Sequence, residues 1–154
     1  MRTVFLLALI TAILLQPASA QTAPWFGTWK LNFAESTGNP GSRFKKVVTK
    51  IEPTEQGLKV IYDAVGVRGG LTHMEWTGQF DGRDYSVQGV DYVLTNAYSR
   101  IDDRSYQIVV KVDGVTAATT KVAVSADGKT LTTLTTETNA QNQRAATTSV
   151  YDRQ

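Results

Sequence analysis

A histidine and a glutamate separated by one residue form the most chemically suggestive pair in the chain. His73 is the only histidine, and Glu75 follows inside a segment rich in strand-forming residues. Side chains at i and i+2 of a β-strand project from one face, so the two groups are expected to lie side by side. Facing an interior, the pair would orient a polar head group or act as a general base. Facing solvent, it would be a charged strand surface that alternates with the apolar Met74 and Trp76.

The serines of the chain do not complete a hydrolytic site around this pair. Ser86, Ser99 and Ser149 lie in distant segments, and there is no Gly-x-Ser-x-Gly motif. A hydrolase needs a nucleophile and an oxyanion-stabilising group in addition to a base. We therefore expect that the protein is not an enzyme.

Aromatic and basic side chains form a second candidate site. Tyr98 and Arg100 share one strand face by the same alternation. Projecting into an interior, an arginine and a tyrosine hold a carboxylate or phosphate through charge-assisted hydrogen bonds. In the alternative, Arg100 lies beside a turn and forms surface ion pairs with Asp102 and Asp103. The candidate ligand-binding residues are Tyr62, His73, Glu75, Trp76, Tyr98 and Arg100.

The composition excludes most other site chemistry. The chain has 154 residues, no cysteine, one histidine and a formal net charge of +2. Without cysteine there are no disulfides, iron–sulfur clusters or zinc–thiolate sites, and a single histidine removes most histidine-rich metal sites. A charge of +2 creates no strong field for binding nucleic acid. We therefore expect no cofactor, no metal and no nucleic-acid partner.

The first 20 residues have the features of a cleavable export signal. Arg2 precedes a mostly apolar run over 4–15, Pro17 ends the run, and 18–20 supply the small residues that signal peptidase needs. The run is shorter than the roughly 20 apolar residues of a membrane span. We expect cleavage after Ala20, no membrane span after cleavage, and export to the periplasm or the extracellular medium. The alternative is an uncleaved N-terminal anchor.

The rest of the sequence predicts strands almost throughout. Asp-Gly dipeptides, which favour hairpin turns, occur at Asp81-Gly82, Asp113-Gly114 and Asp127-Gly128. The longest loop, 33–44, has room for a single helical turn within 33–37. Turn signals delimit expected strands at 25–32, 45–52, 58–65, 71–80, 83–88, 91–101, 104–112, 115–124, 129–138 and 144–152.

Strands linked by short turns form an antiparallel meander. A long meander twists, and closing it into a barrel removes its exposed edges. We therefore predict an all-β fold, an antiparallel up-and-down β-barrel of about 8–10 strands, with a β-sandwich as the competing architecture. The domain organisation is a signal peptide over 1–20, an N-terminal tail over 21–24 and one barrel domain over 25–154.

A threonine-rich stretch and a basic stretch are expected on the outside of this barrel. Threonine is frequent between 116 and 148, where it suits a solvated wall, or in the alternative a flat array that matches a repeating polymer. Basic residues gather between 43 and 50. They would favour an acidic partner or a lipid head group, or form a solvated sheet edge, where lysine deters strand pairing.

The first predicted strand carries a recognisable signature. Gly27-x-Trp29, within Gly-Thr-Trp-Lys-Leu, resembles the calycins, which include the lipocalins and the intracellular fatty-acid-binding proteins. A group of small exported bacterial proteins is also similar and shares an Asp-Gly-Lys-Thr-Leu turn, here 127–131. The resemblance implies that an arginine near the end of the barrel, Arg153 or else Arg144, packs on Trp29 and closes the barrel floor. A guanidinium stacks well on an indole face, so the roles of Gly27, Trp29 and Arg153 are structural.

The chain departs from the fatty-acid-binding proteins in two places. Those proteins insert a helix pair after the first strand, for which the segment 33–44 is too short. Their anion-binding Arg-x-Tyr on the last strand is not reproduced, because the order here is Tyr151-x-Arg153. Both differences argue against carriage of a fatty acid.

The resemblance implies an exported, lipocalin-like barrel that binds or carries a small hydrophobic or amphipathic molecule. Aromatic residues such as Tyr62, Trp76, Phe80 and Tyr98 are expected to line its cavity. The alternative is a non-enzymatic interaction or inhibitor barrel with a filled core, whose end loops bind a protein partner. A void inside the barrel distinguishes the first function from the second.

Overall fold

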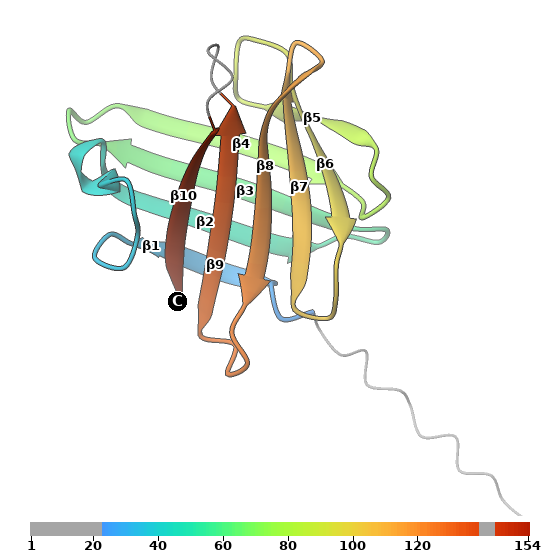
Figure 1. Ribbon diagram of the computed structural model, residues 1–154, viewed down its shortest axis with the longest axis horizontal. Coiled ribbons are helices and arrows are strands. Elements are labelled where there is room, and N and C mark those ends of the chain that lie inside the picture. The colour runs from blue at the N-terminus through green and yellow to red at the C-terminus, as the bar shows by residue number, and fades with distance from the viewer. Residues whose placement is uncertain (1–22, 139–143) are drawn as a thin grey trace, which may run out of the picture.

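The computed structural model describes residues 23–138 and 144–154 (Figure 1). The expected signal peptide over 1–20, the first two residues of the expected tail and the expected turn over 139–143 lie outside the described residues. The described chain consists of β-strands, their connections and one short 3₁₀ turn, η1.

The strands form one closed antiparallel barrel. Each strand pairs with its sequence neighbours, and β1 pairs with both β2 and β10, which closes the sheet. This confirms the predicted all-β up-and-down barrel and excludes the sandwich. Each strand overlaps one of the expected segments. Their bounds are β1 (Gly27–Asn32), β2 (Phe44–Pro53), β3 (Leu58–Gly66), β4 (Leu71–Gly78), β5 (Asp84–Gln88), β6 (Leu94–Arg100), β7 (Ser105–Val112), β8 (Val115–Val124), β9 (Thr130–Thr138) and β10 (Arg144–Arg153).

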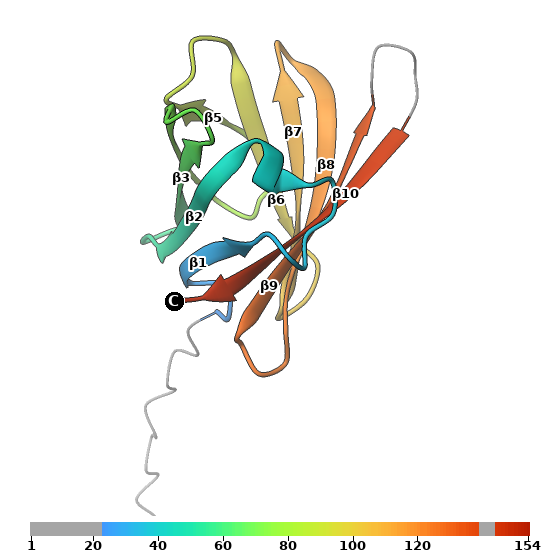
Figure 2. The same cartoon turned by 90° about the vertical axis from the view of Figure 1, so that its left-hand side faces the viewer.

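The barrel is flattened into two crossing layers. Strands β2, β3 and β4 run across the direction of β7 to β10 in Figure 1, and the view turned by 90° separates the two layers (Figure 2). The right-handed twist of each strand produces this crossing when a sheet closes on itself. Side chains that alternate inward along the strands therefore meet between the layers.

The two ends of the barrel differ in how they are filled. One end, called the floor, carries segment 23–26 and the β2–β3, β4–β5, β6–β7 and β8–β9 connections. At the floor the ring of Trp25 packs edge-on against Phe80 and Tyr106, with 5.4 Å between ring centroids in both pairs. The other end, called the mouth, carries η1 and the β3–β4, β5–β6 and β7–β8 connections. Buried residues of the floor cluster are Trp25, Trp29, Ile51, Leu58, Trp76, Tyr98, Tyr106, Val122, Val124 and Leu131.

The β1–β2 connection at the mouth corrects one prediction. The helical turn expected within 33–37 lies instead at η1 (Pro40–Ser42), where the fixed φ of proline suits the first helical position. Residues after β1 form a turn because the Asn32 side chain accepts hydrogen bonds from the backbone N–H groups of Ala34 and Glu35. The segment between β1 and β2 holds no helix pair.

Arg153 fastens the floor where the first and last strands meet. Its guanidinium carbon lies 4.2 Å from the centre of the Trp29 ring, and Trp29 is fully buried. The same guanidinium donates hydrogen bonds to the carbonyls of Pro24, Phe26 and Gly128. Gly27 leaves room for it, since its φ is +140° and a Cβ there would lie 2.5 Å from an Arg153 Nη atom. Three separate chain segments are therefore joined by one side chain.

We expect Arg153→Lys to lower the free energy of unfolding by about 1–3 kcal/mol. Lysine keeps the charge but cannot stack flat on Trp29 while donating in three directions. Urea denaturation followed by tryptophan fluorescence measures the change. The control is Arg144→Lys, an exposed position at the opposite end of β10. Equal stability of the two variants would contradict the assignment of the floor contact to Arg153.

Candidate ligand-binding cavity

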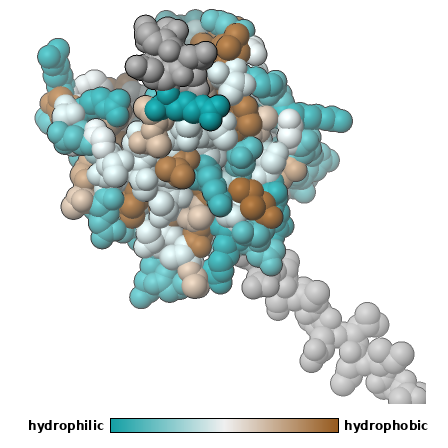
Figure 3. Space-filling view, viewed as in Figure 1, coloured by the Kyte–Doolittle hydropathy of each residue, from teal (hydrophilic) through white to brown (hydrophobic). Residues whose placement is uncertain are grey.

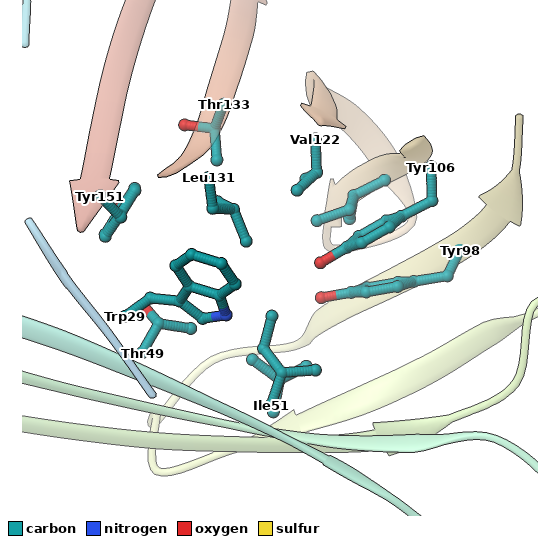
Figure 4. Close-up of a pocket in the computed structure, with 11 residues that line it drawn as sticks. Trp29, Thr49, Ile51, Tyr98, Tyr106, Val122, Leu131, Thr133 and Tyr151 are labelled. Atoms are coloured by element: carbon teal, nitrogen blue, oxygen red, sulfur yellow. The ribbon is translucent and has the colours of Figure 1, made fainter. Parts of the chain in front are cut away.

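Three cavities that share lining residues occupy the barrel between the floor core and the mouth. The inner cavity, of about 110 Å³, lies directly above Trp29 (Figure 4). The side cavity, of about 270 Å³, lies beneath β4 and β5 and shares Thr49, Val60 and Tyr98 with the inner cavity. The mouth cavity, of about 240 Å³, shares Tyr151 with the inner cavity. Small-molecule sites typically occupy roughly 300–1,000 Å³, a range that no one of these three cavities reaches alone but that any two of them reach together.

The wall beside the side cavity is the most weakly paired part of the barrel. Strands β4 and β5 pair through two residue positions, whereas β3 and β4 pair through eight. Trp76 spans this seam from inside, because its indole N–H lies 3.2 Å and 3.3 Å from the backbone carbonyls of Tyr85 and Asn96. Its ring stacks on Tyr98 with 3.8 Å between centroids. The seam is therefore held by one aromatic side chain and a short hydrogen-bonded ladder.

Four tyrosine side chains face the cavities. Figure 4 shows the hydroxyl groups of Tyr98 and Tyr106 side by side and directed into the inner cavity. Tyr62 lines the side and mouth cavities, and Tyr151 lines the inner and mouth cavities. Burial raises the pKa of all four phenols above the ordinary value. The phenols are therefore neutral at physiological pH and available as hydrogen-bond donors and acceptors.

Threonine and serine add further neutral hydroxyl groups to the interior. Thr133 lines the inner cavity, Thr135 the mouth cavity, and the buried Thr120 lies 2.9 Å from Thr135 between their hydroxyl oxygens. Alternation along the same strands directs Thr132 and Thr136 outward. The outer face of β7 to β10 is mostly polar or of intermediate hydropathy with scattered hydrophobic side chains (Figure 3). The threonine-rich stretch is thus both an outer wall and an inner lining.

Charged side chains stay at the edges of this interior. Among the residues that the structure describes, the inner cavity is lined by no Asp, Glu, Lys, Arg or His. Arg43 and Glu137 both line the mouth cavity, and both are exposed to solvent. The positive charge of Arg43 partly offsets the effect of burial on the pKa of Tyr62. The interior is apolar and hydroxyl-bearing, and its charges lie near the mouth.

The candidate residues predicted from the sequence fall into two groups. Tyr62, Trp76 and Tyr98 line the cavities together. His73 lies outside, where its Nδ1 is 2.7 Å from an Asp63 carboxylate oxygen. Glu75 borders the side cavity, but its carboxylate lies 2.9 Å from Lys59 Nζ and 3.5 Å from His73 Nε2. The histidine–glutamate pair is therefore part of a charged row on the outer face of β3 and β4.

This outer row raises the pKa of His73. The main cause is the hydrogen bond that the protonated Nδ1 of His73 donates to the Asp63 carboxylate, and the carboxylate of Glu75 adds to it. The His73 side chain is 58% exposed, so solvent screens the interaction. Nothing in this arrangement places a base near the interior.

Arg100 also lies apart from the cavities. Its guanidinium donates to an Asp103 carboxylate oxygen at 2.8 Å and lies 5.4 Å from the Trp25 ring centre. It belongs to the β6–β7 turn at the floor, which matches the surface ion pair considered as the alternative. The structure therefore does not bring Arg100 and Tyr98 together around one ligand.

The cavity-lining residues that were not predicted as ligand-binding residues include Asn96, Tyr106 and Tyr151. Tyr106 and Ile108 are two positions apart and share one strand face, and the apolar Ile108 indicates that this face points inward. Tyr151 precedes Arg153 by two positions, so both project to the same side of β10. The order Tyr-x-Arg thus places the phenol in the cavity and the guanidinium at the floor. Asn96 lies two positions before Tyr98, so the strand alternation that pointed to Tyr98 also indicated that Asn96 could line a polar pocket.

Residues 23–138 and 144–154 lack two further features, a metal-binding cluster and a membrane-spanning helix. Within them, no group of three histidine, cysteine, aspartate or glutamate side chains is arranged to hold a metal ion. The same part of the chain contains no helix with the length and apolarity to cross a membrane.

The chain has a calycin-like β-barrel fold, and cavities lie above its packed floor. A comparison with solved structures finds that it is similar to zebrafish ileal bile acid-binding protein, crystallised in complex with cholic acid. The TM-score is 0.52 and the sequence identity is 13%, over 85% of this chain and 99% of that chain. At this identity the similarity is one of fold. Comparisons with protein-family models and with curated proteins found no match.

We expect stability to fall as the pH rises above 10, the ordinary pKa of tyrosine. The unfolded chain releases its phenol protons there, whereas the buried Tyr98 and Tyr106 keep theirs, so deprotonation favours unfolding. Tyr98→Phe should reduce the slope of the free energy of unfolding against pH by up to about 1.4 kcal/mol per pH unit. Urea denaturation at several pH values between 8 and 11 measures the slope.

Tyr92→Phe is the matched control for this measurement, because Tyr92 is 51% exposed in the β5–β6 connection. Its slope should equal that of the unmodified protein. Identical slopes for Tyr98→Phe and Tyr92→Phe would show that Tyr98 is not protected in the folded barrel.

Proposed function

We propose that the protein binds and carries a small hydrophobic or amphipathic molecule inside its barrel. The observation that carries this proposal is the set of three adjoining cavities, lined by apolar, aromatic and hydroxyl-bearing side chains. Their lining offers both apolar surface and hydrogen-bonding groups, as an amphipathic ligand requires. The similarity to a barrel that binds cholic acid supports the same function.

The hollow interior favours this function over the alternative of an interaction barrel with a filled core. Side chains fill the floor, where Trp25 and Trp29 are buried, but not the region above them. A barrel that serves only to present its end loops gains nothing from unfilled space, since cavities reduce packing contacts and stability. The cavities therefore indicate that the interior itself is used.

The proposal includes export before ligand binding. The apolar run over 4–15 and the small residues at 18–20 support a cleaved signal peptide. The absence of cysteine means that the barrel needs no oxidising compartment to fold. Its stability rests instead on the floor core and the closed sheet.

Native mass spectrometry of the protein, purified from its own host without detergent, is the direct test. A bound small molecule, identified after solvent extraction, would support carriage and define the ligand class. If no adduct is found and a neutral hydrophobic dye such as Nile red does not bind, the proposal is wrong.

We expect Thr49→Phe to weaken Nile red binding by at least about tenfold. Thr49 lines both the inner and the side cavity, so a phenyl ring there would occupy the space in which they meet. Fluorescence titration measures the affinity, and circular dichroism confirms that the variant is folded.

Thr77→Phe provides the matched control, because Thr77 is exposed on the outer face of β4. This variant should bind Nile red as the unmodified protein does. Equal binding by the two variants would place the dye on the outer surface and contradict an internal site.

A further inference from the structure

One polar atom of the side cavity lacks a hydrogen-bond partner. The side-chain carbonyl oxygen of Asn96, on β6, is buried and accepts no hydrogen bond from the protein. Asn96 lies between Leu94 and Tyr98 on the inward face of its strand, and all three line the side cavity. Buried polar groups are nearly always paired, so this unpaired oxygen beside a cavity is an acceptor that a bound donor would satisfy once the Asn96 amide turns toward it.

The neighbours of Asn96 limit the chemistry of that donor. The side cavity is otherwise lined mainly by apolar side chains such as Met74, Val87 and Val110. Tyr62 adds a neutral phenol to the same lining, because burial raises its pKa. An alcohol hydroxyl suits this set, since it donates to a carbonyl oxygen and accepts from a phenol at the same time.

The charges around the side cavity do not suit an anion. Glu75 is the only charged residue of its lining within the described chain, and its carboxylate is engaged by Lys59 on the outer face. In the described part of the sequence, Arg43 is the one basic residue in the lining of the three cavities, and it lines the mouth cavity together with the opposite charge of Glu137. A carboxylate in the side cavity would be desolvated without a cationic partner, which is strongly unfavourable.

We propose that the side cavity binds the hydroxyl-bearing end of an uncharged amphipathic ligand, with Asn96 as the hydrogen-bond acceptor. This inference rests on the proposed carrier function and specifies the ligand class. The apolar part of the ligand then extends into the inner cavity, which shares Thr49, Val60 and Tyr98 with the side cavity. The inner cavity is lined by apolar and neutral hydroxyl-bearing side chains, so an uncharged ligand needs no oppositely charged partner there.

Competition against Nile red tests the ligand class with three related probes. These are decan-1-ol, its methyl ether and decanoate, measured at pH 8. The alcohol should bind about tenfold more tightly than the ether, because only the alcohol donates to Asn96. Decanoate should compete least. Equal binding of alcohol and ether, or tighter binding of decanoate, overturns the inference.

Substitution of Asn96 separates the hydrogen bond from general polarity. Asn96→Leu should reduce the alcohol-to-ether affinity ratio to about one. The control is Met74→Leu, an apolar exchange in the same cavity, which should preserve the ratio. A ratio unchanged by Asn96→Leu, or lowered equally by Met74→Leu, contradicts the assignment of the acceptor.

The outcomes also distinguish this inference from the proposed function. If Nile red itself does not bind the unmodified protein, carriage fails and the inference fails with it. If Nile red binds and all three probes displace it without preference for the alcohol, the barrel is a carrier and only the ligand class is wrong. If Asn96→Leu does not fold, the alcohol-to-ether ratio of the unmodified protein still decides.

Discussion

The contact between Arg153 and Trp29 is the constraint on which the barrel depends. It joins the last strand to the first at the position where the sheet closes, and it ties in the β8–β9 turn through the Gly128 carbonyl. Planarity matters here, because one guanidinium face covers the indole while its edges donate to surrounding carbonyls. With the floor closed this way, the region above Trp29 does not have to be filled for the sheet to stay closed.

The polarity of the interior follows from how strand alternation distributes the side chains. Inward positions of the last strands carry hydroxyls such as Thr133 and Tyr151, while the inward positions of β2 and β3 include Ile51 and Val60. The result is an interior with many hydrogen-bonding groups and little charge. Burial keeps the phenols protonated, so the lining holds its neutral form across the physiological range. Recognition in such a site depends on hydroxyl geometry and shape rather than on ion pairing.

The fold was predictable from the sequence to a greater extent than the site. Asp-Gly turns and alternation located the strands, because hairpin turns have strong local preferences, as at Asp113-Gly114 with its two positive φ angles. Which face of a strand points inward depends on register, a non-local property. His73 therefore looked like a site residue although it faces solvent, and Arg100 looked like a partner of Tyr98 although it lies in a turn at the floor. The small helical turn begins at Pro40 and not within 33–37, because the fixed φ of proline suits the first helical position.

The separation of a filled floor from a hollow upper half has a consequence for evolution and engineering. Most of the large buried side chains, such as Trp25, Trp29 and Leu58, lie in the floor cluster, where they secure the folded state. Residues such as Thr49, Asn96 and Val110 border empty space and have fewer packing constraints to satisfy. Substitutions there change the shape and polarity of the interior at small cost to folding. The sequence of the interior is thus free to diverge while the architecture is retained.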